Sequence, residues 1–296
     1  MKKQFVGKDV IMMTCSDCNT RCRHCYISYK GNMQKDELDR LVCKWKQQYN
    51  VSLNGTEVII HPEYFEALEA VGQKRIMTNG IEILRNPSIL KKLRSIGVKR
   101  ISISYHIGIH DSISAVNEQT IKEVIRLAKL NSLRVRLMVT VNKYNYMHVE
   151  KICEQAIKLG ADSIRFTNFL RLGNAIELPD DSLTDEQISE FLELIQKVRN
   201  LYDKTLLEVK RCGTYGKGNS KIPNNFMCPA GTNLVAITPD MSVYPCNFLA
   251  KPGYEIGKVE NGIIYITKTI HNDGNRCIAK EIYNNGELFS DYFLTE

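Results

Sequence analysis

Three cysteines stand close together near the start of the chain: Cys18, Cys22 and Cys25. They follow a short apolar run at residues 10–13, which is expected to form a buried strand. Thiolates this close in one loop can bind three irons of a cubane and leave the fourth iron without a protein ligand, whereas four cysteines normally hold an iron–sulfur cluster. The spacing therefore predicts a cluster whose open iron takes an outside ligand, and chemistry can occur at that iron.

The loop at residues 18–25, with Tyr26 after its last cysteine, resembles the cluster loop of the radical S-adenosylmethionine (SAM) enzymes. In that family the amino and carboxylate groups of SAM bind the fourth iron. An electron passed through the cluster then breaks the sulfonium bond and releases a 5′-deoxyadenosyl radical, which takes a hydrogen atom from the substrate. The resemblance implies a 4Fe-4S cluster on Cys18, Cys22 and Cys25, SAM as cofactor, and an external electron donor such as flavodoxin or ferredoxin.

Two other kinds of cysteine site compete with this interpretation. Zinc favours a closed four-ligand site built from two separated pairs, whereas these thiols all fall within one turn of the chain. Cys15 could complete a four-cysteine set and close the cluster, as in an electron carrier. Bacterial ferredoxin loops, however, use two-residue gaps and place Pro after the last Cys, where this chain has a three-residue gap and Tyr26. We therefore expect Cys15 to be a bystander at the end of the strand.

Length and composition set the class of protein. The chain has 296 residues, of which 43% are apolar, so it can bury the core of about two average domains. The first residues lack the apolar stretch of a signal peptide, and no run approaches the roughly 18 apolar residues of a membrane span. We expect a cytoplasmic protein with no membrane segment, in which ten cysteines favour metal binding over disulfides. The net charge of +7 is spread along the chain without interleaved aromatics, so no nucleic-acid binding is expected.

Strand and helix patterns alternate along the first 205 residues. Strands are expected at 10–13, 51–53, 75–78, 100–104, 134–141 and 163–166. Helices are expected at about 34–49, from His61, from Asn86 to Ile96, at about 117–131, at 149–159 and from Thr184. Such alternation indicates an α/β fold with a parallel sheet and right-handed crossovers. It matches the partial (β/α)6 TIM-like barrel of the radical SAM core, which we assign to residues 1–205, with the working groups at the carboxyl ends of the strands.

The segment after the second strand resembles a SAM-binding motif. Relatives carry Gly-Gly-Glu-Pro at this place, and the motif receives the amino group of SAM. Gly55 and Glu57 match it, whereas Thr56 replaces the second Gly and Val58 replaces the Pro. The physical requirement is a backbone carbonyl that an ammonium can approach closely, with a carboxylate nearby. An ordinary strand-to-helix turn remains the alternative for these residues taken alone.

The fourth and sixth strands carry further candidate contacts. Ser104 matches a polar residue that contacts SAM in the family, and the stretch 166–174, including Leu170, resembles the segment that packs on the adenine. His106 stands near the place where related chains usually carry an aspartate, and is a candidate for contacting the substrate or an ordinary loop histidine. His106 and His110 are four residues apart, but the residues between them make a poor helix, so a metal pair is not expected.

The chain changes character after residue 205, where the helical periodicity stops. The pattern from Cys228 to Cys246 resembles the start of the SPASM and twitch extensions, which carry auxiliary 4Fe-4S clusters in one branch of the family. That pattern has Gly where Met241 stands. We expect a hairpin around Asp240, with Met241 in place of the residue best suited to positive φ. Residues 206–296 are therefore assigned to a small C-terminal extension of the twitch type.

The late cysteines suggest one auxiliary cluster. A complete SPASM domain adds a dense later run of cysteines, where this chain offers Cys277. Cys228, Cys246 and Cys277 would be three ligands of a second 4Fe-4S cluster, and Cys212 would be the fourth. Radical epimerases that resemble this chain use an unligated cysteine to return a hydrogen atom to the substrate radical, and Cys212 or Cys277 could take that role. The alternative to a second cluster is that these cysteines are buried, without a metal, in a small β appendage.

The resemblance covers nearly the whole chain and implies a reaction class. Relatives of this size modify ribosomally made peptides by epimerisation or cross-linking, and the basic charge favours a peptide substrate. Only 17 residues precede Cys18, so no fused leader-binding domain is expected at the amino end. The first alternative is radical oxidation or epimerisation of a sugar or aminocyclitol. The second, of a different class, is a non-catalytic electron-transfer protein with two clusters, which would need no substrate cavity.

Overall fold

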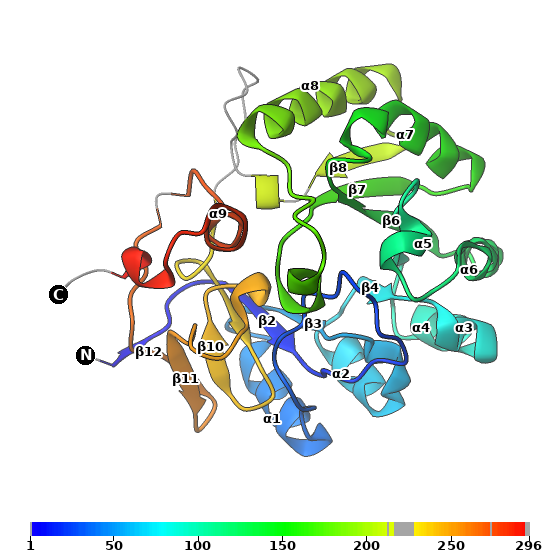
Figure 1. Cartoon of the computed structure of the whole chain (residues 1–296). Coiled ribbons are helices and arrows are strands. Elements are labelled where there is room, and N and C mark those ends of the chain that lie inside the picture. The colour runs from blue at the N-terminus through cyan, green and yellow to red at the C-terminus, as the bar shows by residue number, and fades with distance from the viewer. Residues whose placement is uncertain (1, 212, 216–227, 273, 294–296) are drawn as a thin grey trace.

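The computed structural model describes residues 2–211, 213–215, 228–272 and 274–293. All six predicted strands are present, and they lie in an open, curved arrangement with helices along its outer side (Figure 1). The fold is a partial α/β barrel, as the sequence predicts. It divides into two hydrogen-bonded sheets between the second and third of the predicted strands.

A five-stranded parallel sheet forms the larger part of the barrel wall. Its order follows the chain: β4 (Arg75–Thr78), β5 (Arg100–Ser104), β6 (Arg134–Val141), β7 (Ser163–Asn168) and β8 (Glu208–Arg211). The second sheet has seven strands in the order β1 (Lys3–Gln4), β12 (Ile263–Ile266), β11 (Gly257–Glu260), β10 (Ser242–Tyr244), β9 (Leu234–Ile237), β2 (Asp9–Met13) and β3 (Asn50–Asn54). Only β2, β3 and β9 run parallel within it.

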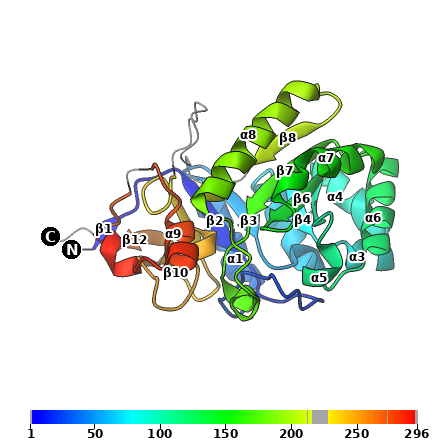
Figure 2. The same cartoon turned by 45° about the horizontal axis from the view of Figure 1, so that its top comes forward.

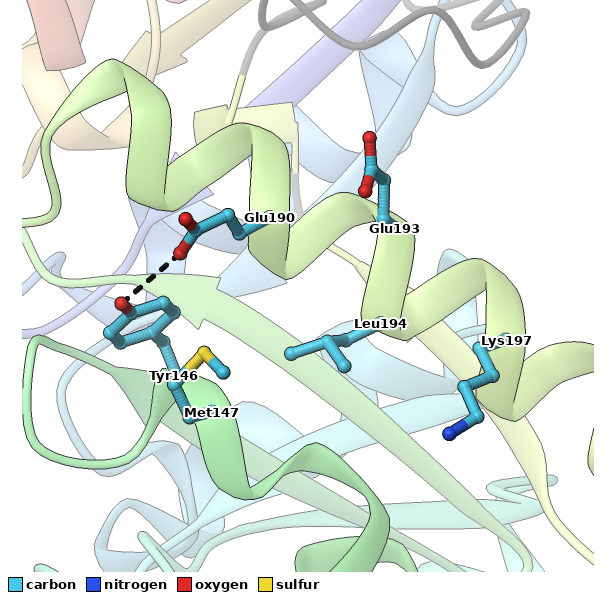
Figure 3. Close-up of a pocket in the computed structure, with 6 residues that line it drawn as sticks. All are labelled: Tyr146, Met147, Glu190, Glu193, Leu194 and Lys197. Carbon is cyan, nitrogen blue, oxygen red and sulfur yellow. Dashed lines mark hydrogen bonds between the residues drawn. The ribbon is translucent and has the colours of Figure 1, made fainter.

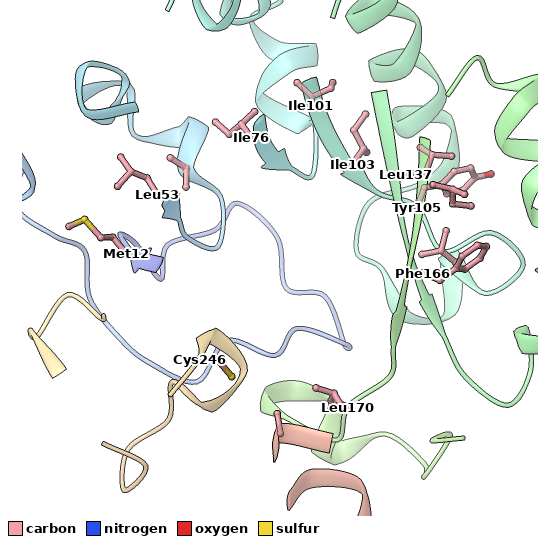
Figure 4. Close-up of a cluster of buried hydrophobic side chains, with 14 of the residues drawn as sticks. Met12, Leu53, Ile76, Ile101, Ile103, Tyr105, Leu137, Phe166, Leu170 and Cys246 are labelled. Atoms are coloured by element: carbon pink, nitrogen blue, oxygen red, sulfur yellow. The ribbon is translucent and has the colours of Figure 1, made fainter. Parts of the chain in front are cut away.

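Residues on the outer face of the curved sheet are apolar and pack against the helices. Figure 4 shows Leu53, Ile76, Ile101 and Leu137 gathered in this layer, and each is at most 2% exposed. The covering helices are α1 (Lys35–Trp45), α2 (Phe65–Ala70), α3 (Ile81–Arg85), α4 (Ser88–Ser95), α6 (Glu118–Leu130), α7 (Val149–Lys158) and α8 (Asp185–Leu201). Alternate strand residues therefore face the helices, and the residues between them face the concave inside of the barrel.

The helix ends show where sequence patterns are reliable. The capping signal at Thr184 is confirmed. Its hydroxyl accepts from the backbone N–H of Gln187, and the side-chain oxygen of Gln187 accepts from the backbone N–H of Thr184. The helix predicted at about 34–49 ends sooner, at Trp45, because the chain turns there to enter β3. The helix predicted from His61 begins as a 3₁₀ turn at Pro62–Tyr64 before α2. The short helix α3 was not expected from the sequence, which predicted a helix only from Asn86 onward.

The carboxyl-terminal segment extends the barrel instead of standing apart from it. Strand β2 pairs with β3 on one edge and with β9 on the other. The amino-terminal strand β1 pairs with β12, and both termini lie on the same side of the molecule in Figures 1 and 2. Strand β8, just after residue 205, completes the five-stranded sheet. The division into residues 1–205 and 206–296 stays a prediction. Both sheets contain strands from each side of this boundary.

The carboxyl-terminal strands contain the expected hairpin. Strands β9 and β10 pair antiparallel, and Met241 in the turn between them has φ 66°. Asp240 stabilises the turn, since its carboxylate accepts from the hydroxyls of Thr238 at 2.6 Å and Ser242 at 2.8 Å. Methionine therefore takes the left-handed conformation that usually favours Gly or Asn. Within the described residues, no helix is both long and apolar enough to cross a bilayer.

Candidate active site

A cavity of about 640 Å³ opens at the carboxyl ends of β2, β3, β4 and β5. This volume lies within the range of small-molecule sites. The cavity brings together residues that are far apart in the sequence because parallel strands end at the same edge of the sheet. Its lining contains most of the site residues that the sequence predicts: Cys18, Cys22, Cys25, Gly55, Thr56, Glu57 and Ser104.

The cysteine loop is held from one side by the segment after β7. The backbone N–H of Asn174 donates to the Cys25 carbonyl at 2.9 Å, and its side-chain amide donates to the Cys22 carbonyl at 3.0 Å. Gly173 has φ 61°, and a Cβ there would lie 2.4 Å from the Cys25 oxygen. Only glycine fits at this point without displacing the loop. The segment that the sequence compares with an adenine-packing strand therefore also supports the cysteine loop.

The opposite side of the loop rests on the segment after α5 (His110–Ile113). The backbone N–H of Arg23 donates to the Ile113 carbonyl at 3.0 Å, and the same oxygen lies 2.9 Å from Nδ1 of His24. The backbone N–H of Ala115 donates to the sulfur of Cys22 at 3.3 Å. The loop is thus clamped between elements that follow two different strands.

Hydrogen-bond donors lie against two of the three loop sulfurs, those of Cys18 and Cys22. The side-chain amide of Asn79 donates to Cys18 Sγ at 3.6 Å, and the hydroxyl of Thr20 lies 3.2 Å from the same sulfur. Burial, and then the neighbouring Cys22 and Cys18, raise the pKa of Cys25. Three thiolates that repel one another need a shared cation, and donors aimed at the sulfurs favour the charged form. This donor set fits a polynuclear iron site.

The described residues offer no comparable site for a single metal ion. Among the described residues, no three side chains of His, Cys, Asp or Glu gather closely enough to hold one ion. A 4Fe-4S cluster requires a different spacing of its ligands, because each cysteine binds a different iron and the sulfurs therefore stay apart.

Glu57 is a buried residue of the cavity lining and connects the ends of β3 and β4. It is 1% exposed, and its two oxygens accept from the Thr78 hydroxyl and the Asn79 backbone N–H, each at 2.6 Å. Burial raises the pKa of Glu57 to about 7. Because Asn79 also donates to Cys18, this carboxyl positions a residue that contacts the cysteine loop.

Cys15 lies in the apolar core, away from the cavity lining. It is fully buried, and its carbonyl accepts from the Thr56 backbone N–H at 3.0 Å and from the Tyr29 hydroxyl at 2.8 Å. A Cβ at Gly55 would lie 2.5 Å from the sulfur of Cys15. Gly55 is therefore needed for packing as well as for any approach of a ligand to its backbone.

His106 lies below the cavity in a chain of neutral histidines. The Thr140 backbone N–H donates to its Nδ1 at 3.0 Å, so Nε2 carries the proton and donates to His24 Nε2 at 3.1 Å. Nδ1 of His24 is then protonated and donates to the Ile113 carbonyl. Burial lowers the pKa of both rings. His106 is 2% exposed and does not line the cavity, so its contact with a substrate stays a prediction.

Leu170 is separated from the cavity lining. It is 6% exposed and belongs to the main apolar core, where Figure 4 shows it on the segment below β7. The chain around it is tied to the last helix, α9 (Ile278–Asn285), because Asn284 accepts from the Arg171 N–H at 3.3 Å and donates to the Phe169 carbonyl at 2.9 Å. Its predicted contact with adenine stays a prediction.

The late cysteines lie on three segments that are connected by backbone hydrogen bonds. The backbone N–H of Cys228 donates to the carbonyl of Gly274 at 2.8 Å, and Gly274 stands three residues before Cys277. Gly231 donates to the Pro245 carbonyl at 3.0 Å, next to Cys246. Cys246 and Cys277 are buried, and Cys228 is partly exposed. Cys212, which the sequence assigns as a ligand or hydrogen donor, lies outside the described residues.

An aromatic contact connects the two groups of cysteines. Tyr26, next to Cys25, packs against Phe248 with ring centroids 5.0 Å apart, and its hydroxyl accepts from the Asn247 side chain at 3.3 Å. Asn247 directly follows Cys246. The carboxyl-terminal segment thus reaches the cysteine loop itself.

A family model supports this reading of the site. The model of the radical SAM superfamily matches residues 12–156, which include the end of β2, the cysteine loop and β3 to β6. Residues 12–156 form a radical SAM domain. No curated protein sequence matches the chain.

Solved structures show that the fold extends beyond the radical SAM domain. SuiB from Streptococcus suis, in its complex with precursor peptide SuiA, superposes with a TM-score of 0.68 at 13% identity over 95% of this chain. The chain spans 65% of the length of SuiB. The structure of anSMEcpe with bound AdoMet and the Cp18Cys peptide superposes with a TM-score of 0.64 at 19% identity, over 86% of this chain and 77% of anSMEcpe. At these identities the likeness concerns the fold.

A separate depression lies on the surface beside α8. Figure 3 shows Tyr146 and Met147 facing Glu190 and Leu194 of the helix, with the Tyr146 hydroxyl 3.2 Å from the Glu190 carboxylate. It shares no residue with the cysteine cavity of the radical SAM domain.

Sequence reasoning missed several residues that hold the loop. Asn79 directly follows the strand predicted at 75–78 but was not singled out, and Asn174 was interpreted only as the end of a segment near the adenine. His24 lies between two cysteines, and no pattern indicates its bond to His106 across 82 positions. Polar residues directly after strands are the signal that could have found Asn79 and Asn174, because side chains at this edge of the sheet converge.

Proposed function

We propose that this chain is a radical SAM enzyme in which Cys18, Cys22 and Cys25 hold a 4Fe-4S cluster. When bound, the cluster and SAM would supply a 5′-deoxyadenosyl radical that removes a hydrogen atom from a substrate. The observation that carries the proposal is the single cavity that contains the three cysteines together with the segment from Gly55 to Glu57. An external flavodoxin or ferredoxin would deliver the electron.

The chain's own residues would bind the cofactor and keep it in place. Asn79 and Ala115 donate to cysteine sulfurs, which stabilises thiolates and holds the loop in one conformation. Thr56 and Ser104 line the cavity and offer a hydroxyl each to the polar groups of SAM. Glu57 has both oxygens occupied by Thr78 and Asn79. Its effect on the SAM ammonium would therefore be electrostatic and would require the carboxylate form.

We propose a ribosomally made peptide as the substrate, modified by epimerisation or cross-linking. SuiB and anSMEcpe, which share the fold, have both been crystallised with peptides. The net charge of +7 favours a peptide with acidic residues. Oxidation or epimerisation of a sugar or aminocyclitol is the alternative among enzymes. A two-cluster electron carrier is less well supported, because a carrier has no need for a 640 Å³ cavity beside its cysteines.

We propose a second, auxiliary 4Fe-4S cluster on Cys228, Cys246 and Cys277. The two backbone bonds that join their segments, and the contact of Tyr26 with Phe248, support this assignment. Cys212 would be the fourth ligand or a hydrogen donor. A hydrogen donor must be largely protonated and a ligand must be a thiolate, so Cys212 cannot do both.

The direct test is anaerobic reconstitution of the full chain, followed by addition of dithionite and SAM. The wild type is expected to form 5′-deoxyadenosine, and Cys22→Ala is expected to form none. Cys43→Ala is the matched control, because Cys43 is exposed on α1 and far from the cavity lining. Full activity in Cys22→Ala, or its loss in Cys43→Ala, would contradict the assignment of the loop.

A further inference from the structure

A second cavity, of about 450 Å³, opens at the amino ends of β4, β5 and β6. This is the end of the barrel opposite to the cysteines: β5 begins at this cavity with Arg100 and ends at the cysteine cavity with Ser104. Four residue steps along a strand span about 13 Å. The two cavities therefore lie at opposite ends of the same strands.

The lining of this cavity is strongly cationic. Five of its residues are basic and none is acidic: Lys74, Arg75, Lys99, Arg100 and Arg134. The three arginines are the first residues of neighbouring parallel strands, and the register aligns Arg75 with Arg100 and Arg100 with Arg134. Aligned residues of neighbouring strands lie on the same face of the sheet, so their like charges repel.

The carboxylate of Glu208 offsets part of this charge, since it opposes the lowering of the Arg100 pKa. Within the described parts of the chain, none of the five basic side chains forms an ion pair with Asp or Glu. The carboxylate of Glu208 instead pairs with two other cations, at 3.3 Å from Arg136 and 2.7 Å from Lys210. Glu208 is therefore already shared by two other cations.

Arg100 is the central member of the row and has an unmet hydrogen-bond donor. It is partly buried, and its Nε atom is buried with no hydrogen-bond partner among the described residues. Burial, and then the charge of Arg75, lower the pKa of its guanidinium. A buried donor without a partner destabilises the fold, and an anion in the cavity would satisfy it.

We propose that this cavity binds a small phosphate-bearing anion at the amino end of the barrel, with Arg100 as its central ligand and Arg75 and Arg134 beside it. Guanidinium groups match phosphate oxygens with paired hydrogen bonds. A volume of about 450 Å³ accommodates a phosphate, a pyrophosphate or the diphosphate of a nucleotide. The site stands on its own residues and does not depend on SAM or on the clusters.

The test measures binding to the intact chain by calorimetry and by the thermal unfolding midpoint, at constant ionic strength adjusted with NaCl. The probes are inorganic phosphate, pyrophosphate and ADP. We expect pyrophosphate to bind more tightly than phosphate and to raise the midpoint. Equal affinities for pyrophosphate and ADP would show that the site contacts only the phosphates, whereas tighter binding of ADP would show that it also contacts the nucleoside.

Three variants locate the site. Arg100→Gln and Arg134→Gln should each weaken pyrophosphate binding about tenfold or more, since each removes charge-assisted bonds. Lys91→Gln is the matched control, because it removes one exposed positive charge from α4 away from the cavity. The proposal is wrong if neither phosphate nor pyrophosphate binds in the millimolar range. It is also wrong if Arg100→Gln and Arg134→Gln both keep the affinity of the wild type. Arg100→Gln should fold, because it removes a repelling charge and an unpaired donor.

Discussion

The two groups of cysteines are built in opposite ways. Cys18, Cys22 and Cys25 lie within eight consecutive residues of one loop. Cys228, Cys246 and Cys277 spread over 50 residues, on separate segments that backbone hydrogen bonds connect. The first group is a local motif that the rest of the fold clamps from outside. The second group depends on the fold, so the auxiliary cluster proposed for it would require the strands and turns between its members to form.

This difference has a physical consequence for metal binding. A contiguous loop loses little chain entropy when its thiolates bind a cluster, whereas a dispersed set needs the surrounding structure to close long loops first. The first group should therefore bind its cluster even when the carboxyl-terminal segment is disturbed. The second group should be more sensitive to changes in packing.

Removing all three loop thiols should have the largest effect. We expect Cys18→Ala/Cys22→Ala/Cys25→Ala to lose SAM cleavage completely while keeping about half of the iron, if each group of cysteines holds one 4Fe-4S cluster. Adding Cys246→Ala should then remove the remaining iron and its visible absorbance. Iron content and absorption spectra after anaerobic reconstitution measure both steps.

The control for this series is Cys15→Ala, which removes a buried thiol outside the cavity lining and should keep both clusters. Complete loss of iron in the triple variant would mean that the late cysteines hold no cluster. Loss of iron in Cys15→Ala, with the fold intact, would instead favour a four-cysteine electron carrier.

Gly173→Ala should disturb the clamp on the cysteine loop. The new Cβ would lie 2.4 Å from the Cys25 carbonyl oxygen in a backbone with φ 61°, so we expect a loss of at least about 2 kcal/mol in the free energy of unfolding. Gly160→Ala is the matched control, since Gly160 has φ 77° with open space around it. It should cost about 1 kcal/mol and leave cluster binding unchanged. Equal losses in urea unfolding would show that contact with the loop is unimportant.

Asn79→Ala should change the cluster more than the fold. It removes the amide that donates to Cys18 Sγ and to the Asn19 side chain. Hydrogen bonds to cluster sulfurs raise the reduction potential. We therefore expect a more negative midpoint potential of the cluster. SAM cleavage should be about tenfold slower, because the variant loses one charge-assisted hydrogen bond to a cluster ligand. Asn200→Ala, on the exposed face of α8, serves as control. An unchanged potential in the spectroscopic redox titration would refute the role of Asn79.

Glu57→Gln should change the clusters least, and its effect on stability should depend on pH. Because burial raises the pKa of Glu57 from 4.5 to about 7, the folded state holds its proton more tightly than the unfolded chain does. Its contribution to stability is full below pH 4.5 and is lost as the pH rises through 7, a change on the order of 3 kcal/mol. The variant should lack this dependence, so its stability relative to wild type should improve from pH 5 to pH 8.

Urea unfolding at the two pH values measures the change, and Glu69→Gln, which alters an exposed carboxylate on α2, should show no such trend. SAM binding to Glu57→Gln should weaken at pH 8, where the carboxylate would attract the ammonium, and less so at pH 6. Equal SAM affinity of variant and wild type at both values would restrict Glu57 to holding Thr78 and Asn79 in place.

The sequence alone determined the parts of this protein that depend on neighbours along the chain. The three loop cysteines, the strand pattern of residues such as 134–141 and the capping box at Thr184 are all local, so spacing and periodicity predict them. The alternation of strands and helices was enough for the partial barrel. Even the positive φ at Met241 followed from the hairpin that its neighbours require.

Only the tertiary structure decided which distant residues serve the site. The bond of Asn174 to the cysteine loop, the burial of Glu57 against Asn79 and the row of Arg75, Arg100 and Arg134 depend on strand order and register. His106 illustrates the reason, because one sequence position can face the cavity or lie beneath it, and a shift of one residue in a strand reverses the choice. Long-range pairing sets that register, and no short pattern in the chain encodes it.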